Sequence, residues 1–524
     1  MPVLTYKEFI QKIRNFSRSS VLEISSRLAW SAWNRPKEVR EERYFQNSLY
    51  MYRAYCGRIA AIAAAVCNDF RSTDVTNYDI EKLCQSYLSI QEPILNEINY
   101  QQTDVLPLQS YLAGSELFHD ILIDIGLIDF CARLLTPIRH LQSQHDSSLS
   151  SDSIHTTIRN YAILLQYLKL RDEGFNNTYL MRLGIEPSNI LKIGLLIIAG
   201  AEKKSGLIVI GENILSNNIK RQTGLDYDAL LVMANRFSRD FNGFRSWHEM
   251  VLRMNPLLSK YVPHPLLETP LIKMASNKFA LPSPWHLMEK IKYSLWEPIT
   301  QQDQMDLIGT AFKNYFDKAI RIILPNALVI DLDQLKCLKG KKRGDYLLHQ
   351  SGRGLIVELK RSVGSYSGSA ISEPKDVVEF CERIGSALMQ CGHTLKYMND
   401  VERELNIKIE KVGTLICLLE EFVPSSVFYA LYFNTELHRK CGVEQFELVS
   451  IDQFECLLMD VGFENVFDAL TRNEKGETTG LIGIKPMRKS IYKDRKEKSS
   501  TQMAWHHLDQ FKKELLPSED TTTI

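Results

Sequence analysis

The sequence of 524 residues lacks the features of several large protein classes. Its ten cysteines are scattered, with no CxxC pair, and are too few for a disulfide scaffold, so we expect reduced, buried thiols and a cytoplasmic protein. The most apolar stretches, 59–67 and 193–199, are far shorter than the roughly 20 residues that cross a bilayer. We therefore expect neither a membrane span nor, because charged residues precede any apolar run at the N-terminus, a secretory signal.

Charge and short motifs exclude further classes. Lysine plus arginine equals aspartate plus glutamate at 63 each, so any attraction to nucleic acid must be local. There is no GxxxxGK[ST] and no GxSxG, which disfavours a P-loop nucleotidase and a serine hydrolase of the α/β type. No four Cys or His residues have the spacing of a zinc site. A hydrophobic fraction of 44% is that of an ordinary globular protein.

The apolar pattern divides the chain into five parts. Apolar residues recur every three or four positions over 1–140, which predicts a helical domain. A serine-rich stretch at 141–156 predicts a linker or loop, and 157–299 predicts a second helical region that ends in several prolines. Residues 300–484 predict an α/β domain, and 485–524 a basic tail in which Lys485 to Lys513 hold nine Lys/Arg against three Asp/Glu.

The α/β part alternates helical and extended patterns. A helix is expected over 306–320, and a long helix opened by Pro374 carries its apolar residues on one stripe. Short apolar segments predict strands at 345–349, 355–363, 412–419, 427–433 and 445–450. Because helices separate these strands, they cannot all pair as hairpins, and we expect a mixed sheet.

The residues with the clearest chemical meaning lie on the first two of these strands. A turn at 351–354 joins them, so Asp345 on one strand lies near Glu358 on the next. Side chains alternate along a strand, which directs Glu358 and Lys360 to one face and Leu355, Val357 and Leu359 to the other. Two adjacent carboxylates suit Mg²⁺, which prefers oxygen ligands and keeps several waters. Alternatively, Asp345 is a turn residue and Glu358 pairs with Lys360 or Arg361 on a wet sheet face.

This acid followed by Glu-x-Lys resembles the PD-(D/E)xK nuclease superfamily, over about residues 300 to 470. The resemblance implies an α-helical N-terminal region followed by an α/β restriction-endonuclease-like domain with a mixed sheet. It implies Asp345 and Glu358 as ligands of Mg²⁺ or Mn²⁺, with the Leu359 carbonyl as a candidate third. It also implies that Lys360 orients or activates the attacking water and that Gln390, on the following helix, faces the site.

One position departs from the pattern of this superfamily. Many members carry a glutamate on the first helix that adds to the metal site, and this chain has Lys313 at the comparable position. Either Asp306 or Asp317 substitutes for it, or the site works with two carboxylates, or metal binding is weakened. An inactive site is the remaining alternative.

Basic residues near Asp345 are the candidate contacts to nucleic acid. The segment 336–343 holds five basic side chains in eight residues, and a flexible basic loop at the site would attract a phosphate backbone regardless of sequence. The candidates are Lys336, Lys339, Lys341, Lys342 and Arg343, with Arg361 at the end of the second strand. A solvated charged loop is the alternative.

The sequence thus predicts a metal-dependent nuclease, with DNA as the favoured substrate. The resemblance implies a role in bacterial defence against phage or foreign DNA, with the helical part as a sensor, partner-binding or oligomerisation region and a homo-oligomer as the expected assembly. A non-catalytic nucleic-acid-binding or assembly subunit with a degenerate nuclease fold is the alternative. A third, weaker hypothesis is a HEPN-like ribonuclease, from the spacing of Arg133 and Arg139 relative to His140 and His145.

Overall fold

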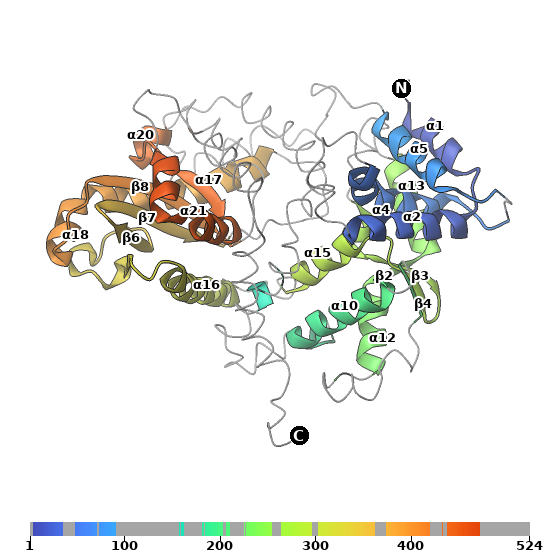
Figure 1. The fold of residues 1–524 in the computed structure, drawn as a ribbon, viewed down its shortest axis with the longest axis horizontal. Helices are drawn as coiled ribbons and strands as arrows, with labels where there is room; N and C mark the ends of the chain where they lie inside the picture. The colour runs from blue at the N-terminus through green and yellow to red at the C-terminus, as the bar shows by residue number, and fades with distance from the viewer. Residues whose placement is uncertain are drawn as a thin grey trace, which may run out of the picture.

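The computed structural model describes residues 4–34, 48–70, 73–90, 157, 159–161, 181–182, 184–202, 206–209, 225, 227–253, 264–295, 302–361, 374–419, 432 and 437–471. The expected linker at 141–156, the basic tail and the four Arg and His residues of the ribonuclease hypothesis lie outside these ranges. The strand expected over 427–433 also lies outside them, apart from Tyr432. We call the described residues up to 295 the N-terminal region and 302–471 the α/β domain (Figure 1).

The first part of the N-terminal region is helical, as the sequence predicts. It contains α1 (Tyr6–Ile13), α2 (Arg18–Trp33), α4 (Ser48–Val66) and α5 (Asn77–Leu88). Capping boxes begin α1 and α5: the Thr5 and Thr76 hydroxyls accept a backbone N–H, and Glu8 and Asp79 bond back to the two threonines. The apolar faces of these helices meet in one buried cluster that includes Phe9, Cys56 and Tyr87.

The second part of the N-terminal region is not entirely helical, and this corrects the prediction for 157–299. It holds α10 (Pro187–Glu202), α12 (Tyr227–Arg236), α13 (Phe241–Arg253), α14 (Pro265–Glu268) and α15 (Pro284–Ser294). Between them, β1 (Leu207–Val209), β2 (Ser238–Asp240), β3 (Leu271–Ala275) and β4 (Lys278–Ala280) form a four-stranded sheet in the order β1-β4-β3-β2. Strands of three to five residues are too short to show a period of two, so the sequence pattern did not reveal them.

The α/β domain has the predicted mixed sheet. Its order of elements is α16 (Gln302–Ile323), β5 (Leu328–Asp331), two 3₁₀ turns (Leu332–Gln334 and Lys336–Leu338), β6 (Tyr346–Gln350), β7 (Arg353–Lys360), α17 (Pro374–Lys396), α18 (Met398–Leu405), β8 (Lys411–Leu418), α20 (Leu437–Cys441), β9 (Glu447–Ser450) and α21 (Ile451–Thr471). The five strands lie in chain order, β5-β6-β7-β8-β9. Antiparallel pairing joins β5, β6 and β7, and parallel pairing joins β7, β8 and β9.

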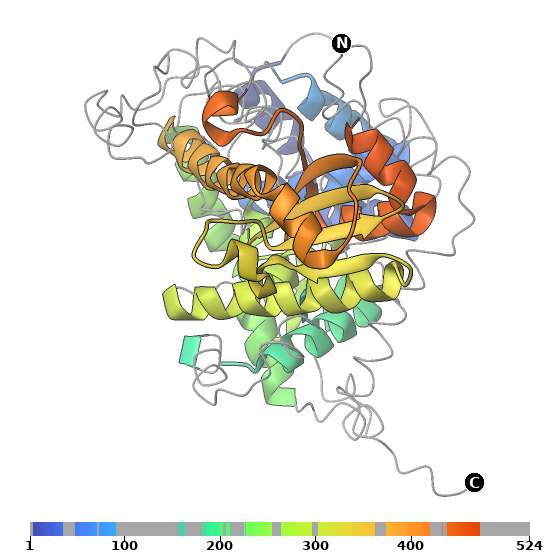
Figure 2. The ribbon, with the colours of Figure 1, turned by 90° about the vertical axis from the view of Figure 1, so that its left-hand side faces the viewer.

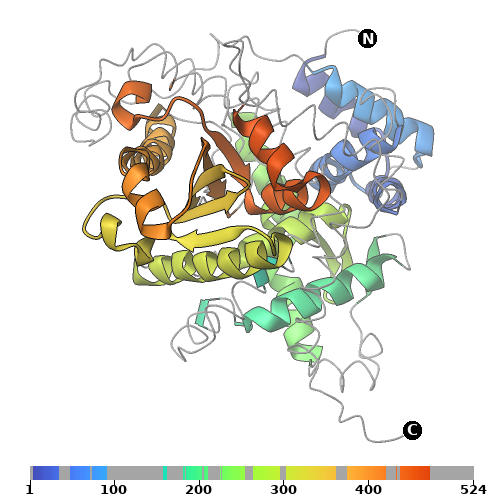
Figure 3. The same ribbon diagram turned by 60° about the vertical axis from the view of Figure 1, so that its left-hand side comes forward.

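Helices cover both faces of this sheet. On one face, Leu355 and Val357 of β7 pack in a cluster with α16 and α21. On the other face, Ile356 packs with α17, α18 and α20. Figures 2 and 3 show α16 running along one side of the strands, and Figure 2 shows α17 on the opposite side. The alternation predicted for β7 is therefore confirmed, and it directs the neighbouring Glu358 toward α17.

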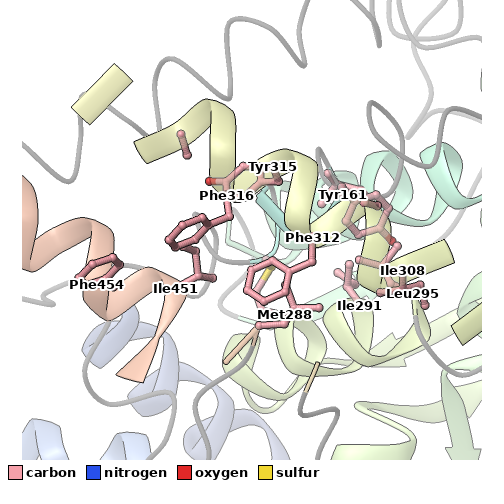
Figure 4. Close-up of a cluster of buried hydrophobic side chains, with 14 of the residues drawn as sticks. Tyr161, Met288, Ile291, Leu295, Ile308, Phe312, Tyr315, Phe316, Ile451 and Phe454 are labelled. Carbon is pink, nitrogen blue, oxygen red and sulfur yellow. The ribbon is translucent and has the colours of Figure 1, made fainter. Parts of the chain in front are cut away.

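A buried cluster connects the N-terminal region to the α/β domain. Met288 and Ile291 of α15 belong to the same apolar cluster as Phe312 and Phe316 of α16 (Figure 4). A polar link lies nearby: the Tyr315 hydroxyl donates to Glu455 Oε1 at 2.7 Å, and Arg159 Nη1 lies 3.6 Å from Glu455 Oε2. The face of the five-stranded sheet that α16 covers thus belongs to a cluster shared with the N-terminal region. Among the described residues, no helix has the length and apolarity to cross a membrane.

Candidate active site

The hairpin of β6 and β7 brings the two predicted carboxylates together. Its two-residue loop has positive φ at Ser351 (51°) and Gly352 (74°), the backbone of a type I′ turn, which fixes the register of the strands. Tyr346 pairs with Val357, so Asp345 follows beside Glu358. The Asp345 N–H donates to the Val357 carbonyl at 3.0 Å, and its Oδ2 accepts the Leu359 N–H at 2.8 Å. Asp345 is therefore held in place by the strand that carries Glu358.

Glu358 is the most buried carboxylate of this group, with 4% of its surface exposed. Burial, and next the adjacent Asp345 carboxylate, raise the pKa of Glu358 to about 8, although Lys360 opposes both effects. Such a shift is expected when two carboxylates share a poorly solvated place. Glu358 pairs with Lys360, as the alternative expected, but not on a wet sheet face. Its side chain lies under α17 beside the buried Cys391, whose pKa is raised by burial and by Glu358.

Lys360 and Gln390 complete the group that the sequence predicted. Lys360 Nζ lies 2.7 Å from Glu358 Oε1 and donates to Gln390 Oε1 at 3.2 Å. Gln390 lies on α17, so the amide bridges the sheet and the helix that covers it. One turn further along α17, the Thr394 hydroxyl accepts the N–H of Gly344 at 2.9 Å. These two contacts fix the position of α17 over the strand ends that carry the site.

Lys313 of α16 lies among three aspartates at the site. Its Nζ lies 3.1 Å from Asp331 Oδ1, 2.5 Å from Asp333 Oδ2 and 3.6 Å from Asp345 Oδ1. Burial alone would lower the pKa of Lys313, but the surrounding carboxylates outweigh it and raise that pKa. An ammonium group thus neutralises the outer side of Asp345, where the superfamily pattern would have a further carboxylate. Asp331 and Asp333 were not predicted, because β5 and its 3₁₀ turn were not recognised.

The two candidate substitutes for the missing glutamate have other partners. Asp317 forms an i,i+4 ion pair with Arg321, whose Nη2 lies 2.8 Å from Asp317 Oδ1. Asp306, at the start of α16, is within electrostatic reach of Arg361. Asp317 is therefore paired with Arg321 within α16, and Asp306 lies near Arg361 at the end of β7.

The donor atoms fit a small hard cation with an incomplete protein shell. Asp345 and Glu358 are in direct contact and supply carboxylate oxygens. The bond from Leu359 to Asp345 is made by the Leu359 N–H and not by the carbonyl that the resemblance implies as a third ligand. Within the described part of the chain, no three His, Cys, Asp or Glu residues converge as a metal-binding group. Two carboxylates suit Mg²⁺, since that ion usually keeps waters and takes the remaining ligands from a substrate phosphate.

The basic segment before Asp345 is more ordered than the sequence suggested. The expectation of a flexible loop is corrected by the 3₁₀ turn at Lys336–Leu338, whose first two N–H groups donate to the Glu404 carboxylate at 2.9 and 2.8 Å. Arg343 is used internally, with its Nη2 2.6 Å from Asp333 Oδ1. Lys341 lies over the Tyr397 ring, 3.4 Å from its centroid. The exposed members of the set are Lys336, Lys339 and Lys342.

Arg361, which follows β7, and Arg383 of α17 form a separate pair of basic residues. Burial lowers the pKa of Arg361, the positive charge of Arg383 lowers it further, and Asp306 opposes both. Arg383 is exposed and lies seven residues before Gln390 on α17, which places both on one helix face. Sequence reasoning named Arg361 and missed Arg383, because only the packing of α17 along β7 brings them together.

Comparison with known proteins adds no family to this description. No family model, curated protein or solved structure matches the chain. The geometry of the site therefore carries the functional argument.

Proposed function

We propose that the α/β domain is a restriction-endonuclease-like domain that hydrolyses phosphodiester bonds of nucleic acid with Mg²⁺ or Mn²⁺. The observation that carries this proposal is the convergence of Asp345, just before β6, with Glu358 and Lys360 of β7 and Gln390 of α17. A buried Glu358 with a raised pKa, in contact with a second carboxylate, is an arrangement that a divalent cation would stabilise.

In this function each side chain has a distinct task. Asp345 and Glu358 would hold the metal, which when bound lowers the pKa of water and neutralises charge on the phosphate. Lys360, hydrogen-bonded to Gln390, would donate to the attacking water or to the phosphate oxygens as they gain charge. The amide of Gln390 restricts the lysine to one direction. Loss of Lys360 should therefore reduce turnover more than binding.

Positive side chains around these groups would hold the substrate backbone. Lys336, Lys339 and Lys342 are exposed before Asp345, and Arg361 with Arg383 lies at the end of β7. Arginine and lysine contacts to phosphates give affinity without reading sequence. DNA is the substrate that we favour, and the role in defence stays a prediction of the resemblance.

A cleavage assay tests this function. Wild type, Lys360→Ala and the matched control Lys411→Ala, an exposed lysine on β8, would be incubated with plasmid, single-stranded DNA and RNA. We expect cleavage that requires Mg²⁺ or Mn²⁺, stops in EDTA, is lost in Lys360→Ala and is retained in Lys411→Ala. Equal cleavage by both variants would show that Lys360 is not needed and that another site or a contaminating nuclease cleaves the substrate.

The non-catalytic alternative has one specific observation in its favour. The ammonium group of Lys313 lies 3.6 Å from Asp345 Oδ1 and partly neutralises the charge that a metal would need. Calorimetric titration of Mn²⁺ into wild type and Glu358→Gln separates the two functions. The nuclease proposal expects saturable binding that requires Glu358, and a structural scaffold expects the same heats from both proteins.

A further inference from the structure

Helices α12 and α13 of the N-terminal region are joined by only four residues, 237–240, and the hairpin of β3 and β4 follows them in the chain. A connection of three or four residues between two helices is typical of helix-turn-helix proteins, whose second helix enters the major groove of DNA. Here the connection contains β2, which pairs in parallel with β3. The sheet therefore ties α13 to the hairpin.

The inner face of α13 is fixed against the rest of the N-terminal region. The helix begins after Asp240, whose Oδ1 accepts the Gly243 N–H at 2.8 Å. Phe244, Trp247 and other buried side chains of α13 belong to apolar clusters that contain side chains of α4. The helix is thus held on one side and presents the opposite side outward.

The outer face of α13 is mainly polar. Its exposed polar side chains recur at steps of three and four residues and so share one face of the helix. They are Asn242, Arg245, Ser246, Glu249 and Arg253. Asparagine, arginine and glutamate are side chains that hydrogen-bond adenine, guanine and cytosine, respectively, in the major groove. Met250 and Leu252 are the exposed apolar residues at the margins of this face.

The tip of the β3–β4 hairpin lies at the same end of the sheet as the start of α13. In the parallel pair of β2 and β3, Asp240 stands opposite Lys273, and beyond this pair β2 leads into α13 while β3 runs on to the tip. The tip, residues 275–278, is exposed. Figure 1 shows β3 and β4 at the right-hand edge of the molecule, on the side away from the α/β domain. A ligand that contacts the start of α13 can therefore also contact the tip.

Positive charge exceeds negative charge on this surface. It carries Arg245, Arg253, Lys273 and Lys278 against Asp240 and Glu249, four basic and two acidic side chains. The Lys273 ammonium donates to the neutral amide of Asn235 at 2.7 Å and therefore keeps its charge. Arg239 pairs with Glu268, with 3.1 Å between Nη2 and Oε2, so these two charges cancel. Since the whole chain has no net charge, this excess is local, and it suits a polyanion.

We propose that α13 and the hairpin tip bind double-stranded DNA, with α13 in the major groove and Lys273 and Lys278 on the phosphate backbone. The major groove of B-form DNA is about 12 Å wide and admits a helix, whereas that of double-stranded RNA is too deep and narrow. Single strands stack on exposed aromatic side chains, and every aromatic side chain in the described residues of α13 and the hairpin is buried or half-buried. This surface goes beyond the proposed nuclease function, because none of its residues lies in the α/β domain.

Fluorescence anisotropy of the full chain with a short labelled duplex of mixed sequence tests the surface. The titrations are made in EDTA, so that cleavage does not occur, and any contacts of the α/β domain are the same in all variants. The variant Arg245→Ala with Lys278→Ala removes two basic side chains from the surface, and Glu249→Gln removes an acidic one. The matched control is Lys7→Ala with Lys12→Ala, which removes two exposed lysines of α1.

The double variant of the surface should lose at least about tenfold in affinity, and the slope of log affinity against log salt should become shallower by about two, because two positive charges no longer neutralise phosphates. Glu249→Gln should bind more tightly, because a carboxylate near the phosphates repels them. The control should bind as the wild type does, and all variants should keep its melting temperature because the replaced side chains are exposed.

Three results would overturn the proposal: an unchanged affinity of the double variant, an equal loss in the control, or tighter binding of single-stranded DNA or duplex RNA than of duplex DNA. Cleavage is not read in this assay, so an inactive α/β domain would leave its outcome unchanged. Conversely, a double variant that binds weakly but still cleaves at saturating DNA would separate this surface from the nuclease site.

Discussion

The buried Glu358 gives the structure a testable dependence on pH. Its pKa is about 8 in the folded protein against an ordinary value of 4.5. Between these values the folded protein keeps a proton that the unfolded chain has released. The contribution of Glu358 to stability is therefore complete below pH 4.5 and is lost as the pH rises to 8. Glu358→Gln has a similar shape and no proton to lose, so it removes this dependence.

The size of the effect follows from the pKa shift. Each pH unit between the two values costs about 1.4 kcal/mol of the free energy of unfolding. From pH 5 to pH 8 the wild type should lose roughly 4 kcal/mol more than Glu358→Gln. For a domain of this size, about 2–4 °C of melting temperature corresponds to each kcal/mol, so the two proteins should diverge by about 10 °C.

Differential scanning calorimetry in EDTA, from pH 5 to pH 8, measures this divergence. Histidines with lowered pKa values, such as His286 and His248, titrate equally in both proteins and cancel in the difference. We expect Glu358→Gln to gain on the wild type steadily as the pH rises. A constant difference in melting temperature across the range would refute the burial of Glu358 against Asp345.

Three further substitutions test other contacts. Lys313→Met leaves Asp331, Asp333 and Asp345 without their shared ammonium and should destabilise the α/β domain by about 1–2 kcal/mol at pH 7; an unchanged melting temperature would contradict the network. Arg383→Ala should raise KM for nucleic acid and leave kcat nearly unchanged, whereas a loss confined to kcat would exclude a backbone contact. Tyr315→Phe removes the bond to the buried Glu455 and should cost about 1–2 kcal/mol in thermal unfolding, with no loss if that bond is absent.

The sequence predicted the hairpin and its carboxylates because local signals determine them. A glycine-containing turn between two apolar strands fixes the register, and the register alone places Asp345 beside Glu358. The stripe of α17 likewise predicted which of its faces is buried. The hairpin and the stripe depend on residues close together in the chain. Gln390 was named from the resemblance alone, and its contact with Lys360 joins residues 30 positions apart.

The parts that the sequence did not predict depend on tertiary contacts. The strands of the small sheet are too short to show a pattern, and β5, at the edge of the large sheet, is recognised only by its pairing with β6. Lys313 was recognised as a departure, but its three acidic partners come from β5, a 3₁₀ turn and the residue before β6. Arg343 was taken as a contact for substrate, whereas Asp333 holds it within the protein.

We propose Asp345 and Glu358 as the metal ligands of a nuclease. Cleavage of a labelled DNA duplex as a function of Mg²⁺ concentration, by wild type and Asp345→Asn, tests it most directly. We expect cleavage that saturates with Mg²⁺ in the wild type and a loss of at least about 100-fold in Asp345→Asn. Cleavage by Asp345→Asn at the wild-type rate, with the same dependence on Mg²⁺, would contradict it.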